Sequence, residues 1–127
     1  PLLRGDLAEL LRAAADGELA RFPRKRLWEE GAACAVVAAS AGYPGDYEKG
    51  RRITVSGDLD GPLFVAGAEL ENGDPEAALL TSGGRVLAVT GRGEDLAAAR
   101  ECAYRNLAAV EFPGQYSRRD IGLTDNF

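Results

Sequence analysis

The 127-residue sequence has no histidine, no methionine and only two cysteines, Cys34 and Cys102. Because it has no imidazole, the chain cannot supply a histidine as a general base. The two cysteines are far apart in the sequence and have no histidine to join them, so a zinc site is hard to assemble. Their apolar neighbours favour two small buried thiols, and a disulfide is the alternative. We therefore predict no metal site in this chain.

Long apolar runs and basic patches are also missing. No segment approaches the ~20 apolar residues of a membrane helix, so no membrane partner is expected. The formal net charge is −5 and the acidic residues are spread along the chain, which leaves no broad basic face for nucleic acid. The chain begins at Pro1, without a signal peptide or a start methionine. We expect a fragment or a processed chain that is soluble and cytoplasmic.

The spacing of apolar residues predicts an α+β fold. A short N-terminal helix is expected over residues 6–15, with Asp6 as its N-cap, and a basic connector follows at 22–28. Strands are expected at 32–39, 53–55, 63–70, 78–81 and 85–90, and a long helix from 94 to about 110. These elements indicate an antiparallel sheet of about five strands with the long helix packed on it. The leucines of the first helix need a cover, either from this domain or from one that precedes it.

Two segments of the chain are rich in glycine. Residues 42–50 contain three glycines, one proline and two tyrosines, which is typical of a shaped loop. Residues 82–84 join two expected strands and indicate a compact hairpin. The run Gly73-Asp74-Pro75-Glu76 falls between strands and is also interpreted as a loop.

Three segments resemble successive signatures of the phosphoribosylamine–glycine ligase family: GYPGDYEKG at 42–50, TSGGRVLAVT at 81–90 and RRDIG at 118–122. Between the second and the third signature, the run DLAAAR at 95–100 and the pair Ala103-Tyr104 also resemble the family. The run DLAELL at 6–11 is similar to the helix that leaves the family's ATP-grasp region. The resemblance implies that residues 1–22 are that helix. It also implies that residues 23–127 are the C-terminal domain of the ligase, a rudimentary hybrid-motif-like domain.

The resemblance implies the purine-biosynthesis ligase that joins glycine to 5-phosphoribosylamine through a glycyl phosphate and gives glycinamide ribonucleotide. The family's metal-holding glutamate and asparagine lie before the start of this sequence. ATP and magnesium are therefore expected in the intact parent chain and not on this fragment, which has no catalytic residue and is expected to be inactive alone. The expected partners are the N-terminal and ATP-grasp domains and the substrates phosphoribosylamine, glycine and ATP.

Two other functions stay open from the sequence. The first is a stand-alone, non-catalytic binding or regulatory module derived from this domain. The second is a structural interaction domain. One departure from the family bears on activity: Val65 and Ala68 stand where relatives commonly have histidine and threonine. Any contact that those polar groups make in relatives is replaced here, or the activity is weaker.

The candidate substrate-binding residues are Tyr43, Gly45, Lys49, Ser82 and Arg85. Glycines let the backbone of the 42–50 loop approach a ligand closely. Lys49 could hold the ribose phosphate, although a surface cation paired with Asp46 or Glu48 is the favoured alternative. For the two tyrosines, Tyr43 and Tyr47, packing over the loop is favoured over ligand contact.

The other two signature segments also have structural alternatives. A hairpin at 82–85 is favoured over a small phosphate cradle, because no helix N-terminus follows it. In the tail, ion pairs of Arg118, Arg119 and Asp120 are expected to pin the chain to the sheet.

Overall fold

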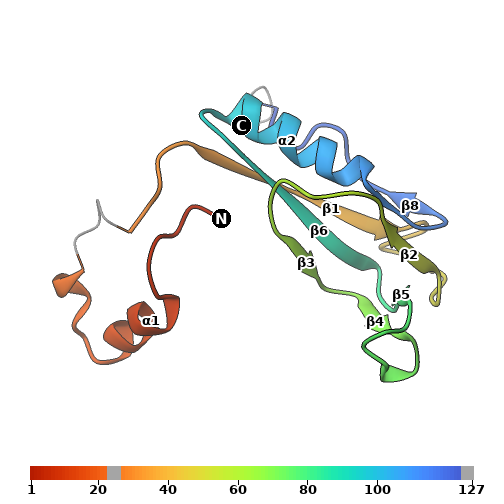
Figure 1. Cartoon of the computed structure of the whole chain (residues 1–127), viewed down its shortest axis with the longest axis horizontal. Coiled ribbons are helices and arrows are strands. Elements are labelled where there is room, and N and C mark those ends of the chain that lie inside the picture. The colour runs from red at the N-terminus through yellow and green to blue at the C-terminus, as the bar shows by residue number, and fades with distance from the viewer. Residues whose placement is uncertain (23–26, 124–127) are drawn as a thin grey trace.

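The computed structural model describes residues 1–22 and 27–123, so part of the expected basic connector, residues 23–26, lies outside the described residues (Figure 1). Within the described residues the chain forms two α-helices and two four-stranded antiparallel sheets. The α+β class is confirmed, with the long helix packed on a sheet and a short helix near the N-terminus. The strands number eight, and not about five, because one expected strand is divided and two strands are only two residues long.

The first sheet is built on two long strands, β1 (Ala32–Ser40) and β6 (Arg85–Gly93). They pair antiparallel from Ala32↔Gly93 to Ala38↔Leu87. The strand β3 (Leu63–Val65) lies on the other side of β6, and β8 (Gln115–Tyr116) lies beside the end of β1. The order is therefore β3-β6-β1-β8.

The second sheet has four short strands in the order β4-β5-β2-β7. Its strands are β4 (Ala68–Leu70), β5 (Leu79–Thr81), β2 (Arg52–Val55) and β7 (Val110–Glu111). The turn η3 (Glu71–Gly73) follows β4 and leads to β5. The run Gly73–Glu76 therefore lies outside the strands, as expected.

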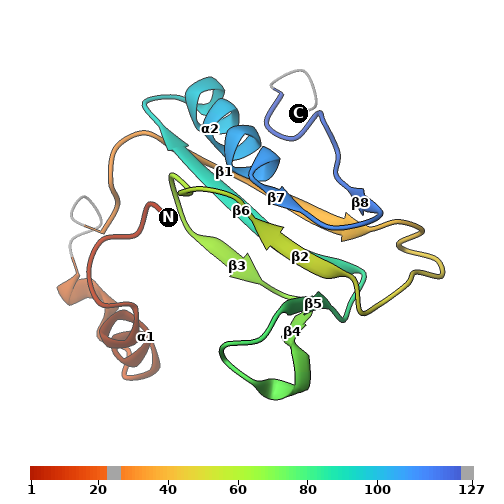
Figure 2. The same ribbon diagram turned by 45° about the vertical axis from the view of Figure 1, so that its right-hand side comes forward.

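The expected hairpin at residues 82–84 is wrong, because β5 and β6 belong to different sheets (Figure 2). The single strand expected at 63–70 is likewise divided into β3 and β4, one in each sheet. Both crossings occur where Gly67 and Gly83 touch: a Cβ on Gly67 would lie 2.8 Å from the Gly83 Cα. The amides of Ser82 and Gly83 both donate to the Gly67 carbonyl oxygen, at 2.8 and 3.0 Å. The two glycines thus allow two segments of the chain, the one between β3 and β4 and the one between β5 and β6, to pass from one sheet to the other at the same point.

The core lies between the first sheet and the helix α2 (Leu96–Ala108), which begins at the capping side chain of Asp95. Val36, Val86 and Val89 are fully buried there, with Ala99 and Ala103 of the helix. The backbones approach closely at Gly91, where a Cβ would lie 2.5 Å from the Ala99 carbonyl oxygen. Cys34 and Cys102 are both buried free thiols, which confirms their expected role.

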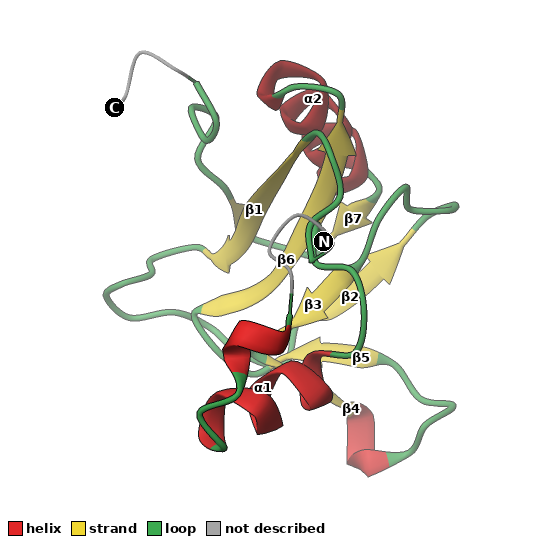
Figure 3. Cartoon of the chain, turned by 90° about the vertical axis from the view of Figure 1, so that its left-hand side faces the viewer, coloured by secondary structure: helices red, strands yellow, loops and turns green. Residues whose placement is uncertain are grey.

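The N-terminal arm, residues 1–22 and 27–30, stands apart from the core in Figure 1 and lies in front of it in Figure 3. Its helix α1 (Leu7–Ala15) begins at the Asp6 carboxylate, which accepts from the amides of Ala8 and Glu9, as the capping pattern predicts. A turn, η1 (Leu19–Arg21), follows. A β-bridge joins Leu3 to Trp28. Within the described ranges, neither helix is long and apolar enough to cross a membrane.

Hydrogen bonds from α2 hold the tail. The Arg100 guanidinium donates to the carbonyl oxygens of Ile121 (3.0 Å) and Arg119 (2.6 Å), and the Tyr104 hydroxyl donates to that of Arg118 (2.7 Å). Arg118 does pair with Asp120, but this ion pair lies within the tail itself. The tail is linked to α2 through its own backbone carbonyl oxygens, because it runs across the side chains of Arg100 and Tyr104.

Candidate functional site

The first two signature segments meet at the end of β1. Ser40, the last residue of that strand, donates its amide to the Gly84 carbonyl oxygen at 2.8 Å. Its hydroxyl donates to the Gly83 carbonyl oxygen at 3.1 Å, and the side chain is buried. These two bonds fix the start of the 42–50 loop against the glycines of the second signature.

A tyrosine ring completes this junction. The ring of Tyr43 lies directly over Gly84, because a Cβ on that glycine would lie 2.8 Å from Cε2 of the ring. Tyr47 meets Tyr43 edge to face, with 6.3 Å between the ring centroids. Each ring keeps part of its surface in solvent. The tyrosines therefore pack within the junction, as the sequence favours, and remain accessible to a ligand.

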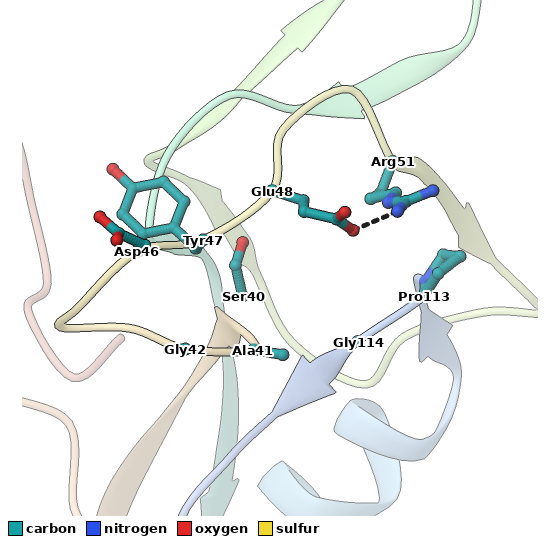
Figure 4. Close-up of a pocket in the computed structure, with 9 residues that line it drawn as sticks. All are labelled: Ser40, Ala41, Gly42, Asp46, Tyr47, Glu48, Arg51, Pro113 and Gly114. Carbon is teal, nitrogen blue, oxygen red and sulfur yellow. Dashed lines mark hydrogen bonds and ion pairs between the residues drawn. The ribbon is translucent and has the colours of Figure 1, made fainter.

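One cavity, of about 610 Å³, lies between the 42–50 loop and the Pro113-Gly114 turn before β8 (Figure 4). Glu48 and Arg51 form an ion pair in its wall. The charge of Arg51 is thereby offset by a neighbouring carboxylate, which weakens its attraction for an anionic ligand. The other lining residues are Ser40, Ala41, Gly42, Asp46 and Tyr47.

A second cavity, of about 460 Å³, is lined by Tyr43 and by residues of the strands β1 and β6. Tyr43, Gly83, Gly84 and Arg85 line it, together with apolar side chains that include Val37 and Ala88. Arg85 is exposed and forms no ion pair with any residue that the structure describes. A guanidinium without a carboxylate partner is suited to bind phosphate or carboxylate oxygens.

The structure thus brings two of the five candidate residues, Tyr43 and Arg85, into one cavity. Gly45 and Lys49 lie on the exposed part of the loop, outside both cavities. Lys49 forms no ion pair within the described ranges, and Glu48 pairs with Arg51 instead. Ser82 is half-buried, with its amide already donated to Gly67.

A phosphate cradle at 82–85 is excluded by this bonding. Such a cradle needs several amide groups that point at the anion. The amides of Ser82 and Gly83 instead share the Gly67 carbonyl oxygen. In this segment the charged group that lines the cavity is the side chain of Arg85.

Sequence reasoning missed the residues that close the two cavities from elsewhere in the chain. Pro113 and Gly114 come from the tail, and Ala66 and Gly67 come from the crossing between β3 and β4. These residues are distant from the signatures in the sequence, and only the tertiary fold brings them to the site. Val65 and Ala68, where the resemblance implies histidine and threonine in relatives, flank Ala66 and Gly67 beside the second cavity.

The titratable groups offer little for catalysis. Burial raises the pKa of the Cys34 thiol, against a smaller opposite effect of the Arg100 charge, so this cysteine is a poor nucleophile at neutral pH. In the part of the chain that the structure describes, no cluster of three or more histidine, cysteine, aspartate or glutamate residues could hold a metal ion. The cavity of Tyr43 and Arg85 thus offers a guanidinium without an ion-pair partner among the described residues.

Comparison with known proteins gives consistent results. The phosphoribosylamine–glycine ligase of Chlorobaculum tepidum is 45% identical over 125 residues, which is 96% of this chain and 28% of that protein. The ligase of the same name from Mycobacterium tuberculosis is 43% identical over 122 residues, again 96% and 28%. The chain therefore spans less than a third of the length of these curated relatives.

A solved structure and a family model agree with these relatives. The crystal structure of phosphoribosylamine–glycine ligase from Thermotoga maritima matches with a TM-score of 0.70 and 36% identity, over 91% of this chain and 28% of that one. The family model described as phosphoribosylglycinamide synthetase, C domain, matches residues 33–124, well over half of the chain. This chain therefore belongs to the family of phosphoribosylglycinamide synthetase C domains.

Proposed function

We propose that this chain is the C-terminal domain of an ATP-dependent ligase that joins glycine to 5-phosphoribosylamine in purine biosynthesis. The observation that carries the proposal is the match of nearly the whole chain to ligases of that name. The junction of Tyr43, Gly84 and Arg85 adds a cavity with an unpaired guanidinium, which suits a phosphorylated substrate. A purine-biosynthesis enzyme works in the cytoplasm, and two free thiols are compatible with a reducing compartment.

In this proposal the chain has no catalytic centre of its own. Activating the glycine carboxylate requires a phosphoryl donor and a divalent cation that offsets the developing charge. The described residues provide no ligand set for such a cation. ATP and magnesium therefore bind in the other domains of the parent polypeptide, and this domain closes one side of the substrate site.

The division of the chain follows the same logic. Residues 1–22 are the helix that leaves the ATP-grasp domain, and residues 23–127 are the C-terminal domain. Two observations support this division: the family model begins at residue 33, and α1 buries only Ala13.

The first test is ADP release by the intact parent protein. Release is expected only when both glycine and phosphoribosylamine are present, and the 127-residue chain alone is expected to release none. A folded full-length protein that releases no ADP with both substrates would contradict the ligase activity. It would favour the alternative, a non-catalytic binding or regulatory module.

The role of the Arg85 cavity is tested by a pair of variants in the same parent. Arg85→Gln removes the unpaired guanidinium, and Arg51→Gln removes one that Glu48 already neutralises. Losing a charged hydrogen bond to the substrate phosphate should raise the KM for phosphoribosylamine about tenfold, with kcat little changed. Arg51→Gln should leave KM within about twofold. Equal KM values in the two variants would remove Arg85 from the substrate site.

A further inference from the structure

The loop that carries Tyr43 is held by backbone hydrogen bonds near its two ends and not in its middle. It leaves β1 after Ser40 and reaches β2 after Arg51 (Figure 4). Within the described residues, the stretch from 44 to 49 takes part in no backbone–backbone hydrogen bond. A segment with few such bonds opens easily, so the conformation of this loop depends on the residues that fasten its ends.

Ser40 fastens the beginning of the loop. Its amide and its hydroxyl donate to the carbonyl oxygens of Gly84 (2.8 Å) and Gly83 (3.1 Å). Ser40 is 5% exposed, so water cannot readily replace the hydroxyl as the donor to Gly83. The Ser40 carbonyl oxygen accepts from the Tyr43 amide, at 3.2 Å, and this bond turns the chain toward the tyrosine.

Thr81, the last residue of β5, fastens the end of the loop. Its carbonyl oxygen accepts from the Gly50 amide (2.6 Å), and its amide donates to the Arg51 carbonyl oxygen (2.8 Å). Its hydroxyl oxygen accepts from the Arg51 amide, at 3.0 Å. Thr81 is 1% exposed, so water cannot readily take the place of this hydroxyl either.

Both ends of the loop are thus fastened to one segment, residues 81–84, and Arg85 follows this segment directly. The ring of Tyr43 lies over Gly84 and lines the cavity of Arg85. Neither Ser40 nor Thr81 lines this cavity. A change at either hydroxyl therefore reaches the cavity only through the loop and Tyr43.

We propose that Ser40 and Thr81 are positioning residues of the substrate site. Their hydroxyls hold the loop so that Tyr43 stays over Gly84 and shapes the cavity in which Arg85 binds the phosphate group of a phosphorylated sugar. The proposal rests on the proposed function and adds two residues that do not touch the substrate. A site that is competent for only part of the time has an apparent affinity reduced by that fraction, so loss of either hydroxyl weakens binding.

Binding of ribose 5-phosphate to the intact parent tests this role. Thr81→Val replaces the hydroxyl by a methyl group, and Thr81→Ser keeps the hydroxyl. The matched control is Thr90→Val: Thr90 is 2% exposed, and its hydroxyl donates to the Pro62 carbonyl oxygen (2.8 Å), outside the cavity. Calorimetry should show a dissociation constant raised about fivefold in Thr81→Val, and within about twofold of the unmodified parent in Thr81→Ser and Thr90→Val. Ser40→Ala should raise it as Thr81→Val does.

Hydrogen exchange at the loop distinguishes positioning from a general loss of stability. The amides of Gly50 and Arg51 both donate to Thr81. In Thr81→Val, peptides of residues 41–51 should exchange at least about fivefold faster than in the unmodified parent, with exchange in α2 unchanged. In the unmodified parent, ribose 5-phosphate should slow exchange of the same peptides, because coupling between ligand and loop is reciprocal. This last measurement decides the proposal even if the variants fail to fold.

Several results would overturn the positioning role. Faster exchange in Thr81→Val and Ser40→Ala with unchanged dissociation constants would make the two hydroxyls structural only. An equal rise of the dissociation constant in Thr90→Val would mean that any lost buried hydrogen bond has this effect. An equal rise in Thr81→Ser would assign the effect to packing of the methyl group. An unmodified parent that does not bind ribose 5-phosphate, or whose loop exchanges no more slowly with it, would remove the link between loop and site.

Steady-state kinetics of the parent separate this role from the ligase activity. In an active ligase, Thr81→Val should raise the KM for phosphoribosylamine about fivefold and leave kcat within about twofold. Absent ADP release by the unmodified parent, together with weaker binding of ribose 5-phosphate in Thr81→Val, would reject the ligase and keep the positioning role. Normal ADP release with unchanged binding in Thr81→Val would reject the positioning role and keep the ligase.

Discussion

The two faces of β1 have nearly the same amino-acid types and opposite surroundings. Toward α2, Val36 and Val89 are buried against alanines of the helix. Away from α2, Val37 and Phe64 are as apolar and remain exposed. A strand that is apolar on both faces is typical of a sheet that is covered on both sides. The comparison teaches that, within the described residues, the position of α2 decides which face of β1 forms the core.

The largest effect should come from changing the covered face at Gly91. A Cβ at this position would meet the backbone of α2, including the Ala99 carbonyl oxygen at 2.5 Å. Backbone cannot give way as a flexible side chain can, so Gly91→Ala should move the helix and lower the free energy of unfolding by about 3 kcal/mol or more. Urea unfolding followed by circular dichroism measures this.

Gly57→Ala is the control for Gly91→Ala. Gly57 has a φ of 79° and nothing within 4 Å of an added Cβ, so only backbone strain changes, at a cost of about 1 kcal/mol. If both substitutions have the same cost, the close approach of α2 to the sheet is not what makes this face the core.

A smaller effect separates the two faces directly. Val36→Ala removes two buried methyl groups and leaves a cavity, which should lower the free energy of unfolding of the 127-residue chain by about 2 kcal/mol. Val37→Ala, one residue away, should change it by less than about 0.5 kcal/mol. Equal values would mean that the side of β1 away from α2 is covered in this chain as well, which would contradict the difference between the two faces.

Sequence patterns identified the core well and the connections between strands poorly. The near-continuous apolar run at 32–39 predicts a doubly covered strand, and β1 has that composition. The turn at 82–84 predicted a hairpin because glycines near the end of a strand favour one locally. The structure shows a crossing between sheets instead, since the partner of Gly83 is Gly67, which no local pattern indicates.

The candidate site shows the same limit. The signatures at 42–50 and 81–90 both contribute residues to one junction, so the segments were found from sequence. Which residues face a cavity depends on tertiary contacts, and these select Tyr43 and Arg85 while they leave Lys49 outside. The sequence alone does not show that the amides of Ser82 and Gly83 donate to the Gly67 carbonyl oxygen and are therefore not free to bind an anion.

The smallest effect concerns the tail, a layer that lies beside α2 on the covered face, where Ile121 packs against the core and a Cβ on Gly122 would lie 3.3 Å from the Cys34 Sγ. A hydrogen bond from Arg118, more than any other influence, lowers the pKa of the exposed Asp120 carboxyl. A lowered folded-state pKa gives stability that is present above the unfolded pKa and is lost as the pH falls through the folded pKa. The tail should therefore loosen in acid below the ordinary range of an aspartate, without unfolding the core.

Arg118→Gln should return the Asp120 pKa toward the ordinary aspartate value, whereas Arg119→Gln should leave the Asp120–Arg118 bond intact. Carboxyl-carbon NMR titration of Asp120 measures both variants. The backbone links from Arg100 and Tyr104 to the tail persist in each case, so the covered face should keep its stability. A tail that detaches completely in Arg118→Gln would instead mean that the local ion pair, and not α2, holds this layer on the covered face.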